Sequence, residues 1–440
     1  MELFGSSGYR AIVDPRFMDV AFRFGFAMAS MADSALIAVD TRTSSDAVKH
    51  CVVSGLLASG CKTYDAGTVP TPTLAYGARQ FGVGIMITAS HNPPEYNGIK
   101  PWNPDGSAFN ARQRRHIERL VSRDISRMAS WENIETMRPY PGLVDAHIDR
   151  ILKDFPDKYS LKVVIDCGGG AGSFITPRLL GRMGCQVIAI NSFPTGFFPR
   201  GTEPTAQSLS DLSQAVPGMN ADLGLAHDAD ADRLVAVDEL GRFVPGDKLM
   251  ALLAGEIGAK SVVTTIDASM AIEDLGYHVT RTSVGDAYVS EQLKKGGDFG
   301  GEPAGAWIFP NVSYCPDGIY AAALATKMAA KGKLSQQVDS IPSYPIRRGS
   351  IKASKSLMES AMKGLLTLSP ISTAKGDGVR MAFTDGWLLV RPSGTEPKVR
   401  VTAEARTQER VNVLYESAIR IIQDLSAEKQ SSIASGALTQ

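Results

Sequence analysis

The sequence predicts an α/β fold, with three related βαβ-containing α/β domains followed by a smaller C-terminal α+β domain. Three stretches share one plan, in which an apolar strand ends in Asp, a helical segment follows, and a second strand begins after Gly. These stretches cover residues 35–65, 163–190 and 262–279. A strand, a helix and a strand at this spacing form a βαβ unit with parallel strands. The length of 440 residues agrees with several domains, because single cores stop growing near about 250–300 residues.

The last hundred residues follow a different pattern. Short apolar strands near 381–383, 387–390 and 399–401 precede a helical segment from about Glu409 to Leu425, which is an α+β arrangement. Pro, Gly or turn residues separate the periodic segments and place the domain boundaries. The predicted domains are domain I at 1–145, domain II at 146–244, domain III at 245–343 and domain IV at 344–428, with a flexible tail at 429–440.

Composition excludes several classes of protein. Lys and Arg number 46 and so do Asp and Glu, so no overall charge favours nucleic acid. The first residues lack the pattern of a signal peptide and no apolar run reaches membrane-spanning length, so we expect a cytoplasmic protein without a membrane partner. The five cysteines lie far apart without a Cys-x-x-Cys pair, which favours neither a zinc site nor a disulfide framework.

Ser90 stands in the segment Thr-Ala-Ser-His-Asn-Pro at 88–93, directly after the apolar run 83–87. An apolar run that ends in small residues, His, Asn and Pro is typical of a buried strand that leads into a rigid loop. Ser90 would then present its hydroxyl at a strand end, where α/β folds place their sites. An ordinary turn explains the same residue types equally well.

A second motif alternates Asp with Ala at Asp228, Asp230 and Asp232 and ends in Arg233. In an extended chain this alternation points the three carboxylates the same way, where they repel unless a cation lies among them. Oxygen ligands without His or Cys select Mg²⁺ or a similar ion, and Mg²⁺ often binds phosphate oxygens as well. A calcium-binding loop is excluded because Arg233 stands where such a loop needs Gly, whereas a solvated acidic turn stays open.

Two further loops carry weaker signals. The loop that begins at Arg391 adds Ser393, Gly394 and Thr395, which together supply a guanidinium, two hydroxyls and a close backbone approach suited to phosphate. An ordinary hairpin turn also fits it. The loop around Glu302 offers one carboxylate that suits the hydroxyls of a polyol-like ligand, although alone it is merely a loop.

Taken in order, these motifs resemble those of the α-D-phosphohexomutase family, which includes phosphoglucomutases, phosphomannomutases and phosphoglucosamine mutases. The resemblance spans nearly the whole chain and implies four domains around a central cleft. The segments that look like the family's amino-terminal motif, phosphoserine loop, metal loop, sugar-binding loop and phosphate loop are residues 4–10, 88–93, 228–233, 302–305 and 391–395.

The resemblance also implies roles for the first loops. Ser90 would carry a phosphoryl group in the resting enzyme. Asp228, Asp230 and Asp232 would hold Mg²⁺ in contact with that group on Ser90. A metal and nearby cations stabilise the charge of a transferring phosphoryl group, so the arrangement is chemically coherent.

Four basic residues complete the implied catalytic set. Arg10 and Arg233 would help to neutralise the phosphoryl group, and His91 and Lys100 are the candidates for general acid and base. Simpler interpretations remain for three of them: His91 could cap its loop, Lys100 could be a solvated surface residue, and Arg10 could pair with a carboxylate on its own domain.

The implied reaction moves phosphate between the C6 and C1 positions of a hexose phosphate. Phosphoserine gives its group to one end of the sugar, and the resulting sugar bisphosphate turns over and returns the other phosphate to Ser90. The expected cofactors are therefore Mg²⁺ and a sugar bisphosphate activator, and the expected partner is a small-molecule phosphosugar. We expect a monomer or a homodimer. The loop of domain IV would hold the phosphate that is not reacting.

This chain departs from the family pattern at two loops. Ala229 replaces the usual Gly of the metal loop, which leaves the Asp ligands intact. The sugar loop reads Glu302-Pro303-Ala304-Gly305-Ala306 where members commonly have Glu-x-Ser-Gly-His, so a hydroxyl and an imidazole are missing. Its form, with Glu302 and Ala304 as the positions that would meet the sugar, is similar to archaeal phosphoglucosamine mutases. Glucosamine phosphate is the expected substrate, with glucose, mannose and pentose phosphates as alternatives.

Two other classes compete with this interpretation. A haloacid-dehalogenase-type phosphatase also uses Asp-x-Asp at a strand end with Mg²⁺, and there Asp228 or Asp230 would be the nucleophile. A non-catalytic sugar-phosphate or nucleotide sensor could use the glycine run Gly168-Gly169-Gly170-Ala171-Gly172, although Ser173 stands where the dinucleotide spacing needs Gly.

Overall fold

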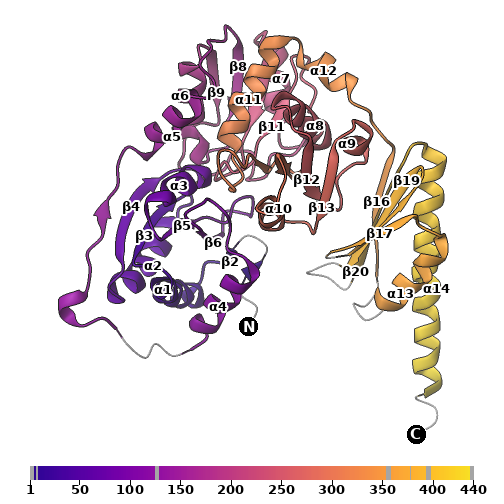
Figure 1. The fold of residues 1–440 in the computed structure, drawn as a ribbon, viewed down its shortest axis with the longest axis horizontal. Coiled ribbons are helices and arrows are strands. Elements are labelled where there is room, and N and C mark those ends of the chain that lie inside the picture. Colours follow the sequence, from indigo (N-terminus) through magenta and orange to yellow (C-terminus); the bar gives the residue numbers. More distant parts are fainter. Residues whose placement is uncertain are drawn as a thin grey trace. The chain divides into compact units, whose positions relative to one another are not determined.

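The computed structural model describes residues 4–5, 8–123, 128–352, 358–376, 378–392 and 398–436. The chain forms two compact units, one of residues 1–262 with 285–340 and the other of residues 263–284 with 341–440, and each unit is described by itself. Figure 1 shows the course of the chain through its helices and strands.

The first sheet has seven strands in the order β1-β2-β6-β5-β3-β4-β7. Strand β3 pairs in parallel with both β4 and β5, and α2 connects β3 to β4, which confirms the first predicted βαβ unit. The elements are β1 Phe4–Gly5, β2 Gly8–Ile12, α1 Pro15–Ala29, β3 Ser34–Val39, α2 Ser45–Ala58, β4 Lys62–Thr68, α3 Thr71–Gly77, η1 Ala78–Gln80, β5 Val83–Ile87, β6 Tyr96–Trp102, α4 Ala111–Val121, η2 Trp131–Asn133 and β7 Arg138–Pro139.

Helices cover both faces of this sheet because its central strands are apolar on both sides. Ile37 of β3 packs in one cluster with residues of α1, α2 and α4. Leu36 and Ala38, which point the other way, pack with Leu74 of α3 and with Leu143. The apolar side chains of β3 and β5 are therefore buried on both faces of the sheet, as expected for parallel strands.

The second sheet has the order β11-β10-β8-β9, with β8 parallel to β9 and to β10. This confirms the second predicted βαβ unit. The elements are α5 Leu143–Leu152, β8 Lys162–Asp166, η3 Ala171–Phe174, α6 Thr176–Arg182, β9 Gln186–Ile190, α7 Ser210–Gly218, β10 Leu223–Ala226 and β11 Val235–Val237. The candidate metal loop is the connection between β10 and β11, which pair antiparallel.

The third sheet has the order β13-β12-β14-β15. Strand β12, helix α9 and strand β13 follow one another as the third repeat predicts, and β12 and β13 are neighbours in the sheet. The elements are α8 Gly246–Glu256, β12 Ser261–Thr265, α9 Ala271–Asp274, β13 His278–Thr282, α10 Asp286–Leu293, β14 Phe299–Gly301, β15 Trp307–Ile308, α11 Gly318–Lys331 and α12 Leu334–Ser340.

The last sheet is antiparallel and has the order β16-β20-β19-β18-β17. Its elements are β16 Ile346–Lys352, α13 Met358–Leu365, η5 Leu366–Leu368, β17 Ser372–Lys375, β18 Val379–Phe383, β19 Gly386–Pro392, β20 Lys398–Ala405 and α14 Gln408–Gly436. The α+β prediction is confirmed. Strands β16 and β17 were not expected, because they are largely polar and half-exposed. Helix α14 ends at Gly436 and so continues into the segment 429–440 that the sequence predicts as a flexible tail.

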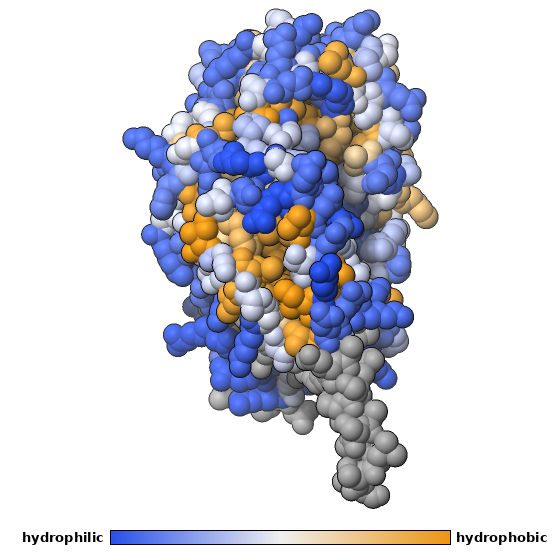
Figure 2. Space-filling view, turned by 90° about the vertical axis from the view of Figure 1, so that its right-hand side faces the viewer, coloured by the Kyte–Doolittle hydropathy of each residue, from blue (hydrophilic) through white to orange (hydrophobic). Residues whose placement is uncertain are grey.

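The surface agrees with the ordinary composition. On the face drawn in Figure 2, hydrophobic side chains appear in patches among hydrophilic ones. In the described part of the chain, no helix is long and apolar enough to cross a membrane.

Candidate active site

Ser90 lies directly after β5, and its side chain faces the acidic loop of the second sheet. Its Oγ donates to Oδ2 of Asp228 at 2.7 Å, and the residue is only 1% exposed. Its φ is +52°, in the left-handed region, which costs a residue other than Gly about 1 kcal/mol. The Ser90 amide donates to Oγ1 of Thr88 at 2.9 Å. The surrounding structure therefore holds the Ser90 hydroxyl in a buried position, unlike a residue of an exposed turn.

Three buried carboxylates converge in the loop between β10 and β11. Asp228, Asp230 and Asp232 are 1%, 0% and 5% exposed, and one carboxylate oxygen from each lies within 4.8 Å of the others. The chain between them is not simply extended, because Ala231 has a φ of +54°. The convergence that the alternation predicts is present, but a turn produces it.

The donor set of this loop fits a hard divalent cation. Oδ1 of Asp230 and Oδ1 of Asp232 are buried and have no hydrogen-bond partner among the described residues. Buried carboxylate oxygens without a partner are costly, and a bound Mg²⁺ would satisfy them. Glu239, the acidic residue at position twelve of the calcium-loop pattern, instead accepts a hydrogen bond from the Ser335 amide at 3.1 Å.

Lys100 supplies a buried positive charge to the same loop. It lies on β6, is 1% exposed, and its Nζ is 2.9 Å from Oδ2 of both Asp230 and Asp232. Burial lowers the pKa of Lys100, but Asp230 and Asp232 outweigh it and raise this pKa above its usual value. Burial raises the pKa of Asp228, and the other two carboxylates raise it further. Lys100 is thus a charged residue of the site and not a solvated surface lysine.

Three more basic side chains lie in or near the Ser90 loop, namely His91, Arg10 and Arg233. Nδ1 of His91 lies 3.4 Å from the Ser90 Oγ. Burial, followed by the charges of Arg233 and Arg10, lowers the pKa of His91 to about 3, so its imidazole is neutral near pH 7. The Arg10 guanidinium donates to Oδ1 of Asn92 at 3.2 Å, and Nη1 of Arg233 lies 3.6 Å from Oε1 of Glu203.

The predicted sugar loop lies against the metal loop. Glu302 is 8% exposed and its Oε1 accepts a hydrogen bond from the Gly285 amide at 2.8 Å, while Ala304 is exposed. The Leu234 amide donates to the Gly305 carbonyl at 2.9 Å, and Arg233 and Ala306 form an isolated β-bridge. Glu302 and the Asp triad therefore belong to one compact unit.

Gly305 is expected to be irreplaceable in this loop. Its φ is +101°, and a Cβ there would lie 2.8 Å from the Leu234 carbonyl oxygen. We predict that Gly305→Ala lowers the free energy of unfolding by about 1–3 kcal/mol, measured by urea denaturation. A matched Gly181→Ala variant should not lower it, because Gly181 lies in helix α6, where its Cβ would have open space and Ala is favoured over Gly by about 0.5–1 kcal/mol. Equal stability of Gly305→Ala and the native protein would contradict this.

The phosphate loop belongs to the other compact unit. Arg391 is half-buried near the end of β19. Ser393, Gly394 and Thr395 lie outside the described residues. The role of this loop stays a prediction.

The structure adds two residues that sequence analysis missed. Thr71, the first residue of α3, donates from its Oγ1 to Oδ2 of Asp230 at 2.5 Å, and its amide donates to the Asp230 carbonyl at 2.9 Å. Thr202 donates from its Oγ1 to the His91 carbonyl at 2.6 Å. These contacts join residues more than a hundred positions apart, and no spacing rule signals them.

The glycine run at 168–172 supports the metal loop rather than a ligand. The amides of Gly168, Gly169 and Gly170 donate to Asp166 Oδ1, the Asn191 carbonyl and the Cys167 carbonyl. The Ala171 amide donates to the Ala229 carbonyl at 2.8 Å, and a Cβ on Gly170 would lie 2.5 Å from the same oxygen. These amides are therefore not available to cradle a phosphate, which disfavours the nucleotide-sensor alternative.

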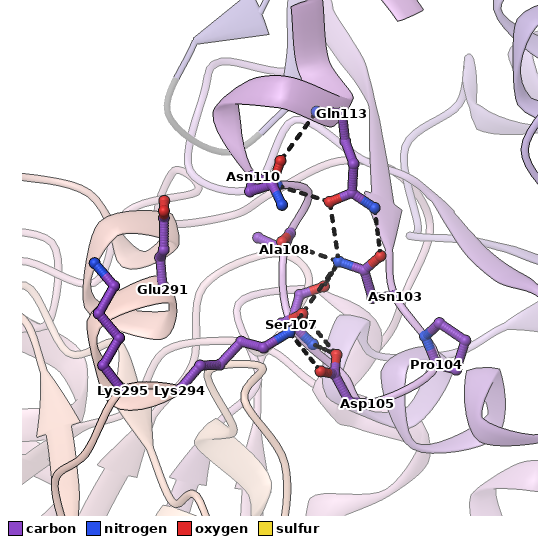
Figure 3. A pocket seen from close by; sticks show the side chains of 10 residues that line it. All are labelled: Asn103, Pro104, Asp105, Ser107, Ala108, Asn110, Gln113, Glu291, Lys294 and Lys295. Atoms are coloured by element: carbon purple, nitrogen blue, oxygen red, sulfur yellow. Dashed lines mark hydrogen bonds and ion pairs between the residues drawn. The ribbon is translucent and has the colours of Figure 1, made fainter. Parts of the chain in front are cut away.

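A pocket of about 540 Å³ lies between the β6–α4 connection and the end of α10, and Figure 3 shows the side chains that line it. Lys294 bridges it, with Nζ 2.6 Å from Oδ2 of Asp105. None of the predicted site residues lines this pocket. The Gln113 side chain donates from its Nε2 to Oδ1 of Asn103 at 2.7 Å, and the Gln113 amide donates to Oδ1 of Asn110 at 3.0 Å, so we assign this pocket no chemistry.

The geometry and the fold together define the class of this protein. Family models for phosphoglucomutase/phosphomannomutase match residues 1–128 with α/β/α domain I, 145–241 with domain II, 245–344 with domain III and 353–420 with the C-terminal domain. The chain belongs to the phosphoglucomutase/phosphomannomutase family. The predicted family, fold class and enzyme class are confirmed, and the match to this family disfavours a haloacid-dehalogenase-type phosphatase.

Several relatives that share one name align with nearly the whole chain. A protein of Methanocella arvoryzae named "Probable phosphoglucosamine mutase" is 47% identical over 433 residues, which cover 96% of this chain and 98% of the relative. Proteins with the same name from Methanosarcina acetivorans and Pyrococcus abyssi are 45% and 41% identical, and each alignment covers 96% of this chain and at least 98% of the relative.

Solved structures share the fold. A phosphoglucomutase/phosphomannomutase family protein from Burkholderia thailandensis is 23% identical, covers 97% of this chain and 98% of its own, and superimposes with a TM-score of 0.84. An N-acetylphosphoglucosamine mutase from Aspergillus fumigatus, solved in complex with GlcNAc-6P and magnesium, is 15% identical, covers 96% of each chain and has a TM-score of 0.61.

Proposed function

We propose that this protein is a phosphoglucosamine mutase that interconverts glucosamine 6-phosphate and glucosamine 1-phosphate through a phosphoserine at Ser90. The observation that carries the proposal is the buried Ser90 hydroxyl, 2.7 Å from Asp228 within a cluster of three carboxylates. Family membership supports the reaction type, and the name that the full-length archaeal relatives share supports glucosamine as the sugar.

Four residues would hold a magnesium ion. These are Asp228, Asp230 and Asp232, whose buried oxygens include two without a partner in the described chain, and Ser90, whose oxygen contacts Asp228. When bound, the ion supplies positive charge that stabilises a phosphoryl group on the Ser90 oxygen. A sugar bisphosphate would be the intermediate of the reaction. It would also phosphorylate a Ser90 that carries no phosphate.

The chain's own residues would divide the remaining work. In the first transfer, the bond between phosphorus and Ser90 Oγ breaks while a bond forms from phosphorus to the free sugar hydroxyl oxygen. The neutral His91 imidazole can accept the proton that leaves that hydroxyl, whereas the protonated Lys100 can only stabilise charge or donate. Arg10 and Arg233 would add positive charge around the transferring group.

The two ends of the sugar phosphate would be held by other loops. Glu302, with Ala304 beside it, would bind sugar hydroxyls, and Arg391, Ser393, Gly394 and Thr395 would grip the phosphate that is not reacting. The bisphosphate then reorients in the site, and its second phosphate is transferred to Ser90. The sugar oxygen that loses this phosphate gains a proton. Each turnover then ends with Ser90 phosphorylated again.

The preferred sugar is tested by steady-state kinetics. With Mg²⁺ and glucose 1,6-bisphosphate present, kcat/KM on glucosamine 6-phosphate is compared with kcat/KM on glucose, mannose and ribose phosphates. We expect glucosamine 6-phosphate to be the best substrate. A higher kcat/KM for glucose or mannose phosphate would favour the phosphoglucomutase/phosphomannomutase alternative, which the name of the family model also describes.

Removal of divalent metal is expected to abolish turnover and to loosen the Asp loop. Without a bound cation, Oδ1 of Asp230 and Oδ1 of Asp232 are buried and have no hydrogen-bond partner among the described residues. Treatment with EDTA should therefore lower the melting temperature by a few degrees, and added Mg²⁺ should restore it, as measured by scanning calorimetry. An Asp230→Asn/Asp232→Asn double variant should lose this response. A native melting temperature that ignores both EDTA and Mg²⁺ would argue against a metal in this loop.

A further inference from the structure

Arg42 contacts the Ser90 loop, and its side chain is buried. It follows β3, and the side chains of Arg42 and Asp40 are both 0% exposed. Nε of Arg42 donates to Oδ2 of Asp40 at 3.1 Å. The guanidinium also lies over the ring of Phe198, with Cζ 5.4 Å from its centroid. A buried charge is costly unless it is paired and fully hydrogen-bonded, so this placement requires a compensating set of partners.

The partners of Arg42 are the backbone carbonyls of the Ser90 loop. Nη2 donates to the carbonyls of Ser90 at 2.7 Å and Asn92 at 2.6 Å. Nη1 donates to the carbonyls of Pro93 at 2.6 Å and Tyr96 at 2.9 Å. With the bond from Nε to Asp40, all five N–H groups of the guanidinium are used. One side chain thus gathers four carbonyl oxygens of the loop that presents Ser90.

Asp40 connects the same pair to the Ser90 amide. Its Oδ2 accepts a hydrogen bond from Oγ1 of Thr88 at 2.6 Å, and that Oγ1 accepts one from the Ser90 amide at 2.9 Å. Its Oδ1 accepts from Oγ of Ser45 at 2.7 Å. The amide and the carbonyl of Ser90 are therefore both held by hydrogen bonds, one through Thr88 and one through Arg42.

This arrangement explains how Ser90 keeps an unfavourable backbone conformation. Its φ of +52° is uncommon for Ser, and such a conformation persists only where the surroundings fix it. Loss of the guanidinium would leave four carbonyl oxygens without this donor and would let the loop relax. Lys could not replace Arg, because a single ammonium offers three N–H groups from one atom and cannot span four carbonyls.

We infer that Arg42 is a positioning residue for phosphoryl transfer: through the Ser90, Asn92, Pro93 and Tyr96 carbonyls, with Asp40 and Thr88, it fixes the direction of the Ser90 Oγ. This inference rests on the proposed function, because it assigns Arg42 to the loop that carries the phosphoryl group. Arg42 contacts the Ser90 carbonyl and not its hydroxyl, so its effect on the reacting oxygen is indirect.

The test compares variants of the full-length protein. Arg42→Lys keeps a charge but not the fork of donors. Thr88→Val removes the hydroxyl between Asp40 and the Ser90 amide, and Thr88→Ser keeps it. Lys49→Met is the matched control, because Lys49 is a nearly buried cation of the same domain that pairs with Asp65 at 3.0 Å, away from the Ser90 loop.

Three measurements are made on each variant. Hydrogen exchange of the peptide covering residues 88–96 is followed in the protein alone. Phosphorylation of Ser90 by glucose 1,6-bisphosphate with Mg²⁺ is followed by intact mass in a single turnover. Steady-state kcat and KM are then measured on glucosamine 6-phosphate.

For Arg42→Lys we expect faster exchange in residues 88–96, a rate of Ser90 phosphorylation and a kcat about 100-fold lower, and a KM within about threefold of the native value. Thr88→Val should change the same quantities in the same direction, Thr88→Ser should restore them, and Lys49→Met should change stability alone. If Arg42→Lys does not fold, the comparison of Thr88→Val with Thr88→Ser tests the inference.

Native rates of Ser90 phosphorylation in both Arg42→Lys and Thr88→Val would overturn the inference while leaving the proposed function intact. A loss confined to KM would overturn it in the same way. If the native protein itself accepts no phosphate on Ser90, the proposed function fails and the inference falls with it.

Discussion

Replacing Ser90 by alanine is expected to lower mutase turnover by about 10⁴-fold or more, because the variant has no oxygen to carry the phosphoryl group between the two transfers. The fold should survive, since the lost hydroxyl makes one hydrogen bond to Asp228 and one close contact with His91. Turnover is measured on glucosamine 6-phosphate with Mg²⁺ and glucose 1,6-bisphosphate. Incorporation of phosphate into the protein is measured by mass in the same samples.

The matched control for this variant is Ser269→Ala. Ser269 is another buried hydroxyl that donates to a carboxylate, Oε1 of Glu404, at 3.0 Å. It should lose far less activity than Ser90→Ala and should still accept phosphate. Native turnover by Ser90→Ala would contradict the phosphoserine route.

The second large effect is expected for Lys100→Met. This change removes the buried cation that lies 2.9 Å from both Asp230 and Asp232 and leaves two buried carboxylates facing each other. Breaking a buried ion pair from one side costs about 3–5 kcal/mol, so the metal-free variant should be strongly destabilised in urea denaturation. Turnover should fall by about 10³-fold, since a charged group at the transferring phosphoryl is lost.

Magnesium separates the two parts of this prediction. Because a divalent cation can replace the positive charge that Lys100 provides, added Mg²⁺ should restore more stability to Lys100→Met than to the native protein. It should not restore turnover. Lys331→Met, which removes an exposed lysine paired with Glu256, is the control and should change stability by less than about 1 kcal/mol. If Lys100→Met is as stable as the native protein without metal, the electrostatic account of this loop is wrong.

The sequence was sufficient to predict features that local spacing determines. Apolar strands that end in Asp, followed by helix and Gly, were enough to predict the βαβ units, since parallel strands are buried on both faces and are therefore continuously apolar. Ser90 and the Asp228–Asp232 motif were found because each follows such a strand directly. The alternation of Asp with Ala predicted convergence, although the structure achieves it through a turn at Ala231.

Features that depend on contacts between distant residues could not be predicted. Thr71 and Asp230 are joined by a hydrogen bond across 159 positions, and Arg42 reaches the Ser90 carbonyl across 48. Neither pair has a periodicity or composition that signals it. Strands β16 and β17 escaped prediction for a different reason: their residues are largely polar and half-exposed, so hydrophobic patterning does not mark them.

The central claim is that Ser90 carries the phosphoryl group, and peptide mapping by mass spectrometry tests it most directly. The protein is incubated with Mg²⁺ and glucose 1,6-bisphosphate, and the peptide covering residues 88–96 is sequenced. We predict one phosphate on Ser90, which glucosamine 6-phosphate removes and the bisphosphate restores. An unphosphorylated Ser90 in a preparation that turns over glucosamine 6-phosphate would contradict the account.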